Sequence, residues 1–357
     1  MQILQSARPT IGYRAFPQAI FMVLPECFSL SAESATDNVY MAASAVNAEL
    51  ALRQSLNLAG ALKAAGIAVV LFPGDKSTPD AVFPNNAFSS AEAQNPESKH
   101  ADANPARGRY FTGVMRHPSR QRETERPDIH HFFSHILGYE YADFSAELVD
   151  AGRAAKAAHV DAGRAAKAAH VDARRAAKAA HVDARRAAKA ALAPAETAEL
   201  TGSLVIDRAR NIGFCGLSQR CSEAGARAMH AAFGLNKTYL FELSAGEYHT
   251  NVVLSALGGK GIVLARAGFA DSNDADVIAA LYPHQCVELS AEEKNNFAAN
   301  CIALRADQLW MSARAERSLQ TATKDRIQSL GLKVHSADLS ELEKAGGSLR
   351  CMIGEIY

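Results

Sequence analysis

Apolar and polar positions along the chain alternate between helical and extended spacing. Residues 54–65 repeat apolar side chains at helical spacing up to Gly66, and residues 67–72 form a β-rich run that Pro73 and Gly74 end. The same alternation continues to the C-terminus. Further strands are predicted at 203–206, 239–241, 261–264 and 332–335, and further helices at 222–233, 273–281, 291–298 and 339–345. Short strands alternating with single helices predict an α/β fold.

An 11-residue repeat interrupts this pattern. The sequence of residues 151–161 recurs unchanged at 162–172, and close copies start at Ala173 and Ala184. Alanine, arginine and lysine favour helices, so we expect residues 151–192 to be a low-complexity insert, helical wherever it is ordered, in a single domain spanning 1–357. Its histidines recur at almost three helical turns, about 16 Å apart, which is too far to share one metal ion. The insert is predicted to be a solvated spacer, and a basic docking arm for an acidic partner is the alternative.

Charge and cysteine content exclude several classes of function. The formal net charge is zero, but residues 151–191 hold ten Lys/Arg and three Asp, so the rest of the chain is mildly acidic and predicts no nucleic-acid surface. The apolar runs are too short to span a bilayer, and the N-terminus has no secretory-signal pattern. Six scattered cysteines without a CxxC pair indicate reduced thiols in the cytoplasm. No Gly-rich phosphate motif follows a strand, so no nucleotide cofactor is expected.

Polar residues of catalytic type gather in four separate segments at the ends of predicted elements. These segments are 80–86, 199–203, 248–251 and 346–351. Taken singly, each has an ordinary explanation, such as a buried cysteine, a hydrogen-bonded structural histidine or an asparagine turn. Together they supply what a cysteine nucleophile needs, namely a histidine and an acidic group far away in sequence. A thiol must lose its proton to attack, and a histidine can act as acid and then as base.

The residues of these segments also resemble a known family. The motifs are Phe83-Pro84-Asn85-Asn86, Glu199 with Thr201-Gly202-Ser203, Tyr248-His249-Thr250-Asn251-Val252 and Gly347-Ser348-Leu349-Arg350-Cys351-Met352. In this order they resemble the amidinotransferase and arginine-deiminase-related branch of the pentein superfamily, over nearly the whole chain outside the repeats. The resemblance implies a five-bladed, pseudo-symmetric α/β propeller with the site at its central axis.

The resemblance further implies nucleophilic substitution, without metal or cofactor, at the carbon of a guanidinium or ureido group. Cys351 would attack that carbon, and His249 would protonate the departing nitrogen and then activate water. Glu199 would hold the substrate nitrogens or the histidine. The residues expected to bind substrate in the same pocket are Asp80, Phe83, Asn85, Asn86 and Asn251.

Two asparagines point to the substrate. Guanidinium-hydrolysing relatives typically place carboxylates where this chain has Asn86 and Asn251. A guanidinium has only donors and suits carboxylates, whereas a neutral urea also has a carbonyl that an amide can serve. This charge matching favours a ureido substrate such as citrulline, although some relatives with asparagine here process arginine derivatives.

Arginines are the candidates for binding the α-carboxylate of a substrate. The six candidates are Arg116, Arg120, Arg122, Arg126, Arg208 and Arg220. We take Arg122, Arg208 and Arg220 as substrate-binding, with surface solvation as the alternative for each. Two departures from the family pattern are Ala87, where close relatives carry tryptophan, and Leu200, where they carry glycine. Leu200 could disturb a turn that needs a positive φ.

The leading hypothesis is a cytoplasmic hydrolase that converts citrulline to ornithine, ammonia and carbon dioxide. One alternative is an arginine deiminase or amidinotransferase acting on a guanidino substrate. A second is a pentein scaffold that binds a partner without catalysis. The expected partner is a small amino acid, with no nucleic acid and no membrane, and a homo-oligomer is left open.

Overall fold

The computed structural model describes residues 1–7, 13–30, 33–42, 45–93, 107–144, 148 and 196–357. The repeat insert predicted at 151–192 lies outside the described residues. Within them, no helix has the length and apolar character that crossing a membrane requires.

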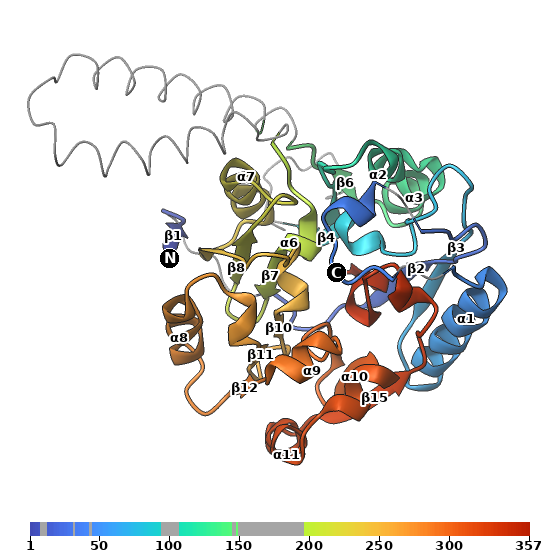
Figure 1. The fold of residues 1–357 in the computed structure, drawn as a ribbon. Helices are drawn as coiled ribbons and strands as arrows, with labels where there is room; N and C mark the ends of the chain where they lie inside the picture. The colour runs from blue at the N-terminus through green and yellow to red at the C-terminus, as the bar shows by residue number, and fades with distance from the viewer. Residues whose placement is uncertain (8–12, 31–32, 43–44, 94–106, 145–147, 149–195) are drawn as a thin grey trace, which may run out of the picture.

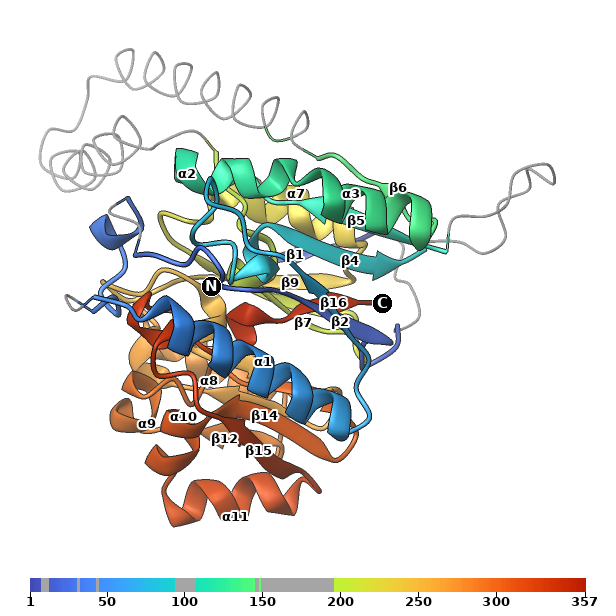
Figure 2. The ribbon, with the colours of Figure 1, turned by 90° about the vertical axis from the view of Figure 1, so that its right-hand side faces the viewer.

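Five small sheets build the described chain. One sheet joins distant parts of the sequence, because the C-terminal strand β16 (Gly354–Ile356) pairs with β2 (Ala19–Val23), which pairs with β3 (Val69–Phe72). Figure 2 shows β16 beside β2. Each of the other four sheets contains three strands that follow one another in the sequence. The first two of these sheets are formed by β4 (Phe88–Glu92), β5 (Gly108–Thr112) and β6 (Glu140–Tyr141), and by β7 (Leu204–Asp207), β8 (Ile212–Leu217) and β9 (Lys237–Glu242). The last two are formed by β10 (Leu254–Ala256), β11 (Ile262–Leu264) and β12 (Cys286–Glu288), and by β13 (Ile302–Arg305), β14 (Gln308–Ser312) and β15 (Lys333–Ala337). Strand β1 (Gln2–Gln5) extends the sheet of β7, β8 and β9 by pairing with β9.

All five sheets share one pairing pattern. In each, the first pair of strands is antiparallel and the second pair is parallel. A parallel pair needs a crossover connection, and here each crossover contains helix. These crossover helices are α1 (Ala48–Ala64), α2 (Pro118–Gln121) with α3 (Pro127–His131), α7 (Glu223–Phe233), α8 (Ser272–Ala280), and α10 (Ala313–Ser318) with α11 (Thr321–Ser329). Figure 1 shows α1, α3, α7, α8 and α11 around the outside, with the sheets within.

The sequence explains where these helices start and stop. Helix α1 begins after Asn47, whose side chain accepts a hydrogen bond from the backbone N–H of Leu50 at 3.0 Å. Helix α7 begins after Ser222, which caps Gly225 in the same way, and ends at Gly234 with φ 64°. Helix α1 buries Leu58 and Leu62 against the β2 sheet in the same apolar cluster as Cys351.

The α/β fold is confirmed, and most predicted elements are present with shifted ends. The helix predicted at 54–65 starts earlier, at Ala48, because Asn47 caps it. The helix predicted at 339–345 is only the 3-10 turn η7 (Leu342–Lys344). The strand predicted from Ser203 starts one residue later because Ser203 ends a short helix. Closure of the five sheets into a propeller stays a prediction.

One-turn segments precede the first strand of each sheet. They are η2 (Pro84–Asn86) before β4, α6 (Leu200–Ser203) before β7, η5 (Thr250–Val252) before β10, residues 297–300 before β13, and η8 (Leu349–Met352) before β16. Segment η2 contacts both α6 and η8, and α6 contacts η5. The four motifs lie on or beside four of these segments, so the fold brings them together.

Candidate active site

One buried cavity collects side chains from these segments and from the loop before α1. It is lined by Ser34, Asn38, Asp80, Phe83, Asn86, Arg120, Arg220, Tyr248, His249, Ala345, Gly347 and Cys351. Cys351 and His249 therefore share a cavity although they are far apart in sequence.

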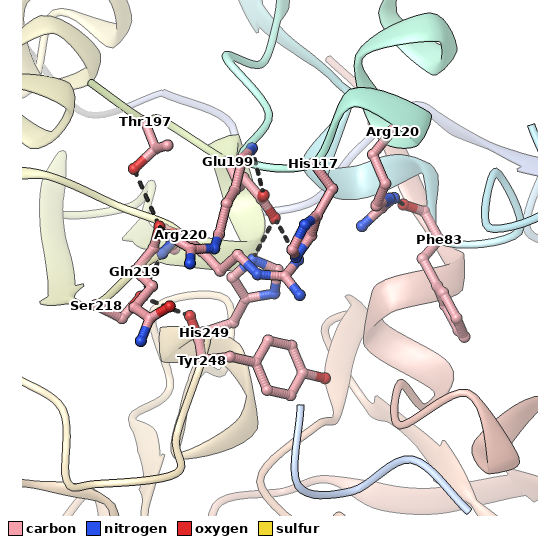
Figure 3. A network of polar contacts seen from close by, with 12 residues as sticks. Phe83, His117, Arg120, Thr197, Glu199, Ser218, Gln219, Arg220, Tyr248 and His249 are labelled. Atoms are coloured by element: carbon pink, nitrogen blue, oxygen red, sulfur yellow. Dashed lines mark hydrogen bonds and ion pairs between the residues drawn. The ribbon is translucent and has the colours of Figure 1, made fainter. Parts of the chain in front are cut away.

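Glu199 holds the histidine from behind. His249 Nε2 lies 2.8 Å from Glu199 Oε2, and both side chains are buried. Glu199 also accepts a hydrogen bond from the backbone N–H of Arg116 at 3.1 Å and pairs with Arg220 at 3.3 Å. Burial alone would raise the pKa of the Glu199 carboxyl, but Arg220 and His249 outweigh it and hold that pKa well below its ordinary value. Glu199 is therefore a carboxylate anion that accepts hydrogen bonds and donates none. Figure 3 shows His249 and Arg220 both meeting this carboxylate.

This contact fixes the state of the imidazole. Since Glu199 accepts, His249 Nε2 carries the proton, and the neutral ring presents its lone pair at Nδ1. Burial lowers the pKa of His249 despite the hydrogen bond to Glu199, so the resting ring is neutral. Among the residues that the structure describes, Nδ1 has no hydrogen-bond partner. That nitrogen is the one free to exchange a proton.

Gly202 allows this arrangement. A Cβ built on Gly202 would lie 2.7 Å from Asn86 Oδ1 and 3.0 Å from both Cε1 and Nδ1 of His249. Any larger residue would push into the catalytic-type histidine. Leu200, two residues before Gly202, is buried and has a φ of 29°. The turn therefore does take a positive φ at Leu200, the position where relatives carry glycine.

Two amides contact the cysteine sulfur. Asn300 Nδ2 donates to Cys351 Sγ at 3.3 Å, and Sγ lies 3.7 Å from Asn251 Oδ1, which can accept the S–H. Burial raises the pKa of the Cys351 thiol. The resting cavity thus holds a neutral thiol and a neutral imidazole.

The cavity also contains a carboxylate without a cation. Asp80 is buried and accepts a hydrogen bond from Ser34 Oγ at 2.7 Å, and within the described chain no Lys, Arg or His lies within 4.0 Å of it. Both cavity arginines are already paired, Arg120 with Glu123 and Arg220 with Asp37 and Glu199. Asp80 is therefore the lining group best placed to receive a cation.

Asp37 secures the loop that covers one side of the cavity. It accepts hydrogen bonds or ion pairs from Arg116, His117 and Arg220. Burial would raise the pKa of Asp37, but His117 and Arg220 hold it far below its ordinary value. The loop carrying Ser34 and Asn38 is fixed to the rest of the site through this carboxylate.

The structure brings together most of the predicted site residues. Cys351, His249, Asp80, Phe83, Asn86 and Arg220 line the cavity. Glu199 contacts His249, and Asn251 contacts Cys351, although neither Glu199 nor Asn251 lines the cavity itself. Asn85 is buried outside the lining, where its carbonyl accepts from Thr201 Oγ1 at 3.0 Å and its side-chain amide has no partner in the described chain.

Arg122 and Arg208 are not brought to this cavity. Arg122 is exposed at the start of the turn η3 (Arg122–Glu125), whose inward residue is Glu123. Arg208 follows the far end of β7, about 13 Å along the strand from α6. There it donates to the carbonyl of Ser90 at 3.0 Å and lies over the Tyr357 ring at 3.6 Å. Their placement corrects the expectation that both share a pocket with Cys351.

Asn300 and Asp37 were missed by the sequence analysis. Asn300 had a signal, since it is a polar residue two positions before a strand, as Asn86 is, while Asn251 and Cys351 stand three positions before theirs. Asp37 lies in a loop without periodicity, and only tertiary contacts reveal it. No group of three or more His, Cys, Asp or Glu in the described chain could hold a metal.

A buried thiol and a neutral imidazole held by a carboxylate meet in an α/β fold of five small sheets, and the model of a hydrolase family matches most of the chain. The family model described as N,N dimethylarginine dimethylhydrolase, eukaryotic, matches residues 24–156 and 176–357. The chain belongs to this family.

Solved structures share the fold at low sequence identity. The N-terminal domain of ArgZ, an arginine dihydrolase from the ornithine-ammonia cycle in Cyanobacteria, has a TM-score of 0.68 and 17% identity over 95% of this chain and 97% of that chain. A dimethylarginine dimethylaminohydrolase variant in an adduct with S-methyl-L-thiocitrulline has a TM-score of 0.59 and 19% identity over 95% of this chain and 100% of that chain. A search of curated protein sequences finds no match.

Proposed function

We propose that this protein hydrolyses a C–N bond at the guanidino carbon of an arginine-type amino acid. The observation that carries the proposal is that the buried cavity of Cys351 and His249 also holds Asp80, a carboxylate that forms no ion pair within 4.0 Å with any described residue. A guanidinium presents only donors and a positive charge, which suits such a carboxylate.

The cavity residues divide the reaction between them. Cys351 Sγ attacks the guanidino carbon, and the tetrahedral adduct expels an amine that His249 protonates. Water, deprotonated by His249, then attacks the thiouronium carbon, and the C–S bond breaks to leave a ureido product and the free thiol. Glu199 stays ionised and keeps the imidazole oriented through Nε2.

The substrate itself helps to form the nucleophile. The Cys351 thiol is neutral at rest because burial raises its pKa. A cation bound between Asp80 and the sulfur would favour the thiolate by direct Coulomb attraction in a buried site. The proton leaves through His249, whose Nδ1 has a free lone pair.

Citrulline is the second candidate substrate. Asn86 lines the cavity, and its Oδ1 has no partner in the described chain, while Asn251 contacts the sulfur. Amides at these positions suit a neutral ureido group. The family name and the structural relatives point instead to dimethylarginine and arginine, and the unpaired Asp80 agrees with a cation.

We further propose that the chain is one catalytic domain interrupted by the insert at 151–192. The shared pairing pattern of the five sheets supports their arrangement as blades of a pseudo-symmetric propeller. The pairing of β16 with β2 would join the two ends of that ring.

A product assay tests the proposal. Purified full-length protein is incubated with arginine, N,N-dimethylarginine or citrulline, and released ammonia, dimethylamine and the amino acid product are quantified. Citrulline formed with ammonia or dimethylamine supports the guanidino proposal, and Cys351→Ala should abolish the release. Ornithine formed only from citrulline would replace it with the ureido alternative. No release from any compound, together with no covalent adduct on Cys351, would contradict both and favour a binding scaffold.

A further inference from the structure

Asn300 joins three segments of the site through one side chain. It is fully buried in the turn before β13, with Cys301 between it and the strand. Its Nδ2 donates to Cys351 Sγ at 3.3 Å and to the backbone carbonyl of Asn251 at 2.9 Å. Its Oδ1 accepts from the backbone N–H of Arg350 at 3.0 Å. The amide therefore bridges the turn of the nucleophile and the turn that follows His249.

The network allows only one orientation of this amide. With Oδ1 and Nδ2 exchanged, an oxygen would face the Asn251 carbonyl and an NH2 group would face the Arg350 N–H. Both contacts would be repulsive, whereas the observed orientation satisfies both amide hydrogens and the oxygen. The donor is consequently held toward the sulfur before any substrate arrives.

We propose that Asn300 is a positioning residue for the nucleophile, and that its fixed N–H stabilises the thiolate form of Cys351. The catalytic meaning of this inference rests on the proposed function. A thiolate only accepts hydrogen bonds, so a donor held by the fold favours it over the thiol, and no reorganisation is needed when the charge forms.

Other charged or titratable groups surround the same sulfur. Arg350 lies on the same turn, and the remaining groups come from the segment before η5 and from across the cavity: Tyr248, His249, Asp80, Arg120 and Arg220. Substitutions at Asn300 replace none of these charged or titratable side chains. A change in thiol titration on replacing Asn300 therefore reports on the amide.

The test follows alkylation of Cys351 by iodoacetamide against pH, with mass spectrometry of the peptide that contains Cys351. It needs no substrate, so its result is independent of the product assay. A hydrogen bond to a charged group corresponds to a shift of about one to two pH units. We expect Asn300→Ala to raise the midpoint by that amount, and Asn300→Asp to raise it further because a carboxylate faces the sulfur.

Ser255→Ala is the matched control. Ser255 Oγ donates to the carbonyls of Ala299 and Cys301, on either side of Asn300, but has no contact with the sulfur. It should disturb the same turn and leave the alkylation midpoint unchanged. With a turned-over substrate, the Asn300 variants should lower kcat on the order of ten- to hundredfold and leave KM nearly unchanged.

Unchanged alkylation midpoints in folded Asn300 variants would overturn the proposal, and any lost activity would then reflect structure alone. A midpoint shifted equally by Ser255→Ala would also overturn it. If Asn300→Asp does not fold, Asn300→Ser carries the test, because its single hydroxyl donor should give a midpoint between those of wild type and Asn300→Ala.

Discussion

At the scale of single residues, the site is organised by which charges have partners. Glu199, Arg120 and Arg220 are buried in ion pairs, whereas Asp80 is buried with a hydroxyl donor and no ion pair among the described residues. Burying a carboxylate without a paired cation is costly, and the proposed cationic substrate would offset that cost. Burial favours the neutral forms of both Cys351 and His249 in the same cavity, because it raises the pKa of the thiol and lowers the pKa of the imidazole.

The buried histidine makes stability depend on pH. Burial holds the pKa of His249 below the ordinary 6.5, so between these two pKa values the unfolded chain binds a proton that the folded chain does not. Stability from this group is complete above pH 6.5 and falls as the pH drops toward the folded pKa. His249→Gln removes this dependence. Chemical unfolding between pH 5 and 8 should show wild type losing stability relative to the variant toward pH 5, and parallel curves would contradict the assignment.

Several of these residues could be predicted from sequence, and others could not. Cys351, His249 and Glu199 stand in motifs that occur in a recognisable order, so their convergence was predictable. Asp37 is a lone acid in a loop, and only its contacts with Arg116 and Arg220 mark it. The arginines were unpredictable for a related reason. Arg120 and Arg220 line the cavity whereas Arg122 and Arg208 do not, and this depends on tertiary placement that charge alone does not reveal.

At the scale of elements, the one-turn segments before the strands position the chemistry. Segment α6 packs against η2 and η5, and Gly202 lets it approach both Asn86 and His249. Leu200 opens the same turn with a positive φ, which costs about 1 kcal/mol, yet its side chain is fully buried in the β7 sheet core. Burial of that side chain, worth roughly 1.5–3 kcal/mol, offsets the strain.

Adding one methyl group to α6 should therefore stop catalysis. Gly202→Ala places its Cβ within 3.0 Å of both His249 and Asn86, so we expect a fall in kcat/KM on the order of a hundredfold or more. Gly60→Ala is the control, because Gly60 lies in α1 with nothing within 4 Å of its built Cβ. It should keep full activity and gain about 0.5–1 kcal/mol of stability. Steady-state kinetics measure the activity of both variants, and urea unfolding measures their stability. An active Gly202→Ala enzyme would contradict the close approach of Gly202 to His249 and Asn86.

At the scale of the whole molecule, five sheets share one pairing pattern, and a one-turn segment precedes the first strand of each. The last sheet is completed by β16, which pairs with β2 from near the N-terminus. Beyond it, the backbone N–H of Tyr357 donates to Ser90 Oγ, so β16 also fastens the neighbouring β4 sheet. The pattern of alternating strands and helices predicted the α/β class, but a strand of three residues such as β16 carries no periodic signal.

Removing residues 354–357 should destabilise the protein and abolish activity. Ile356 and Tyr357 are buried, and their loss costs roughly 3–6 kcal/mol. Removing residues 2–5 instead deletes β1, which among the described strands pairs with β9 at one end of its sheet. That truncation should lower the urea midpoint less and retain activity. Equal effects of the two truncations would show that β16 has no special part in holding the site.

The pairing of β16 with β2 also has a consequence for biosynthesis. A ribosome makes residues 19–23 more than 300 residues before their partner strand β16 and before Cys351, which lies three positions ahead of that strand. Contacts across such sequence separation form slowly. A nascent polypeptide that already contains β2 and β3 therefore waits for more than 280 further residues before the sheet can be completed and Cys351 can join the cavity.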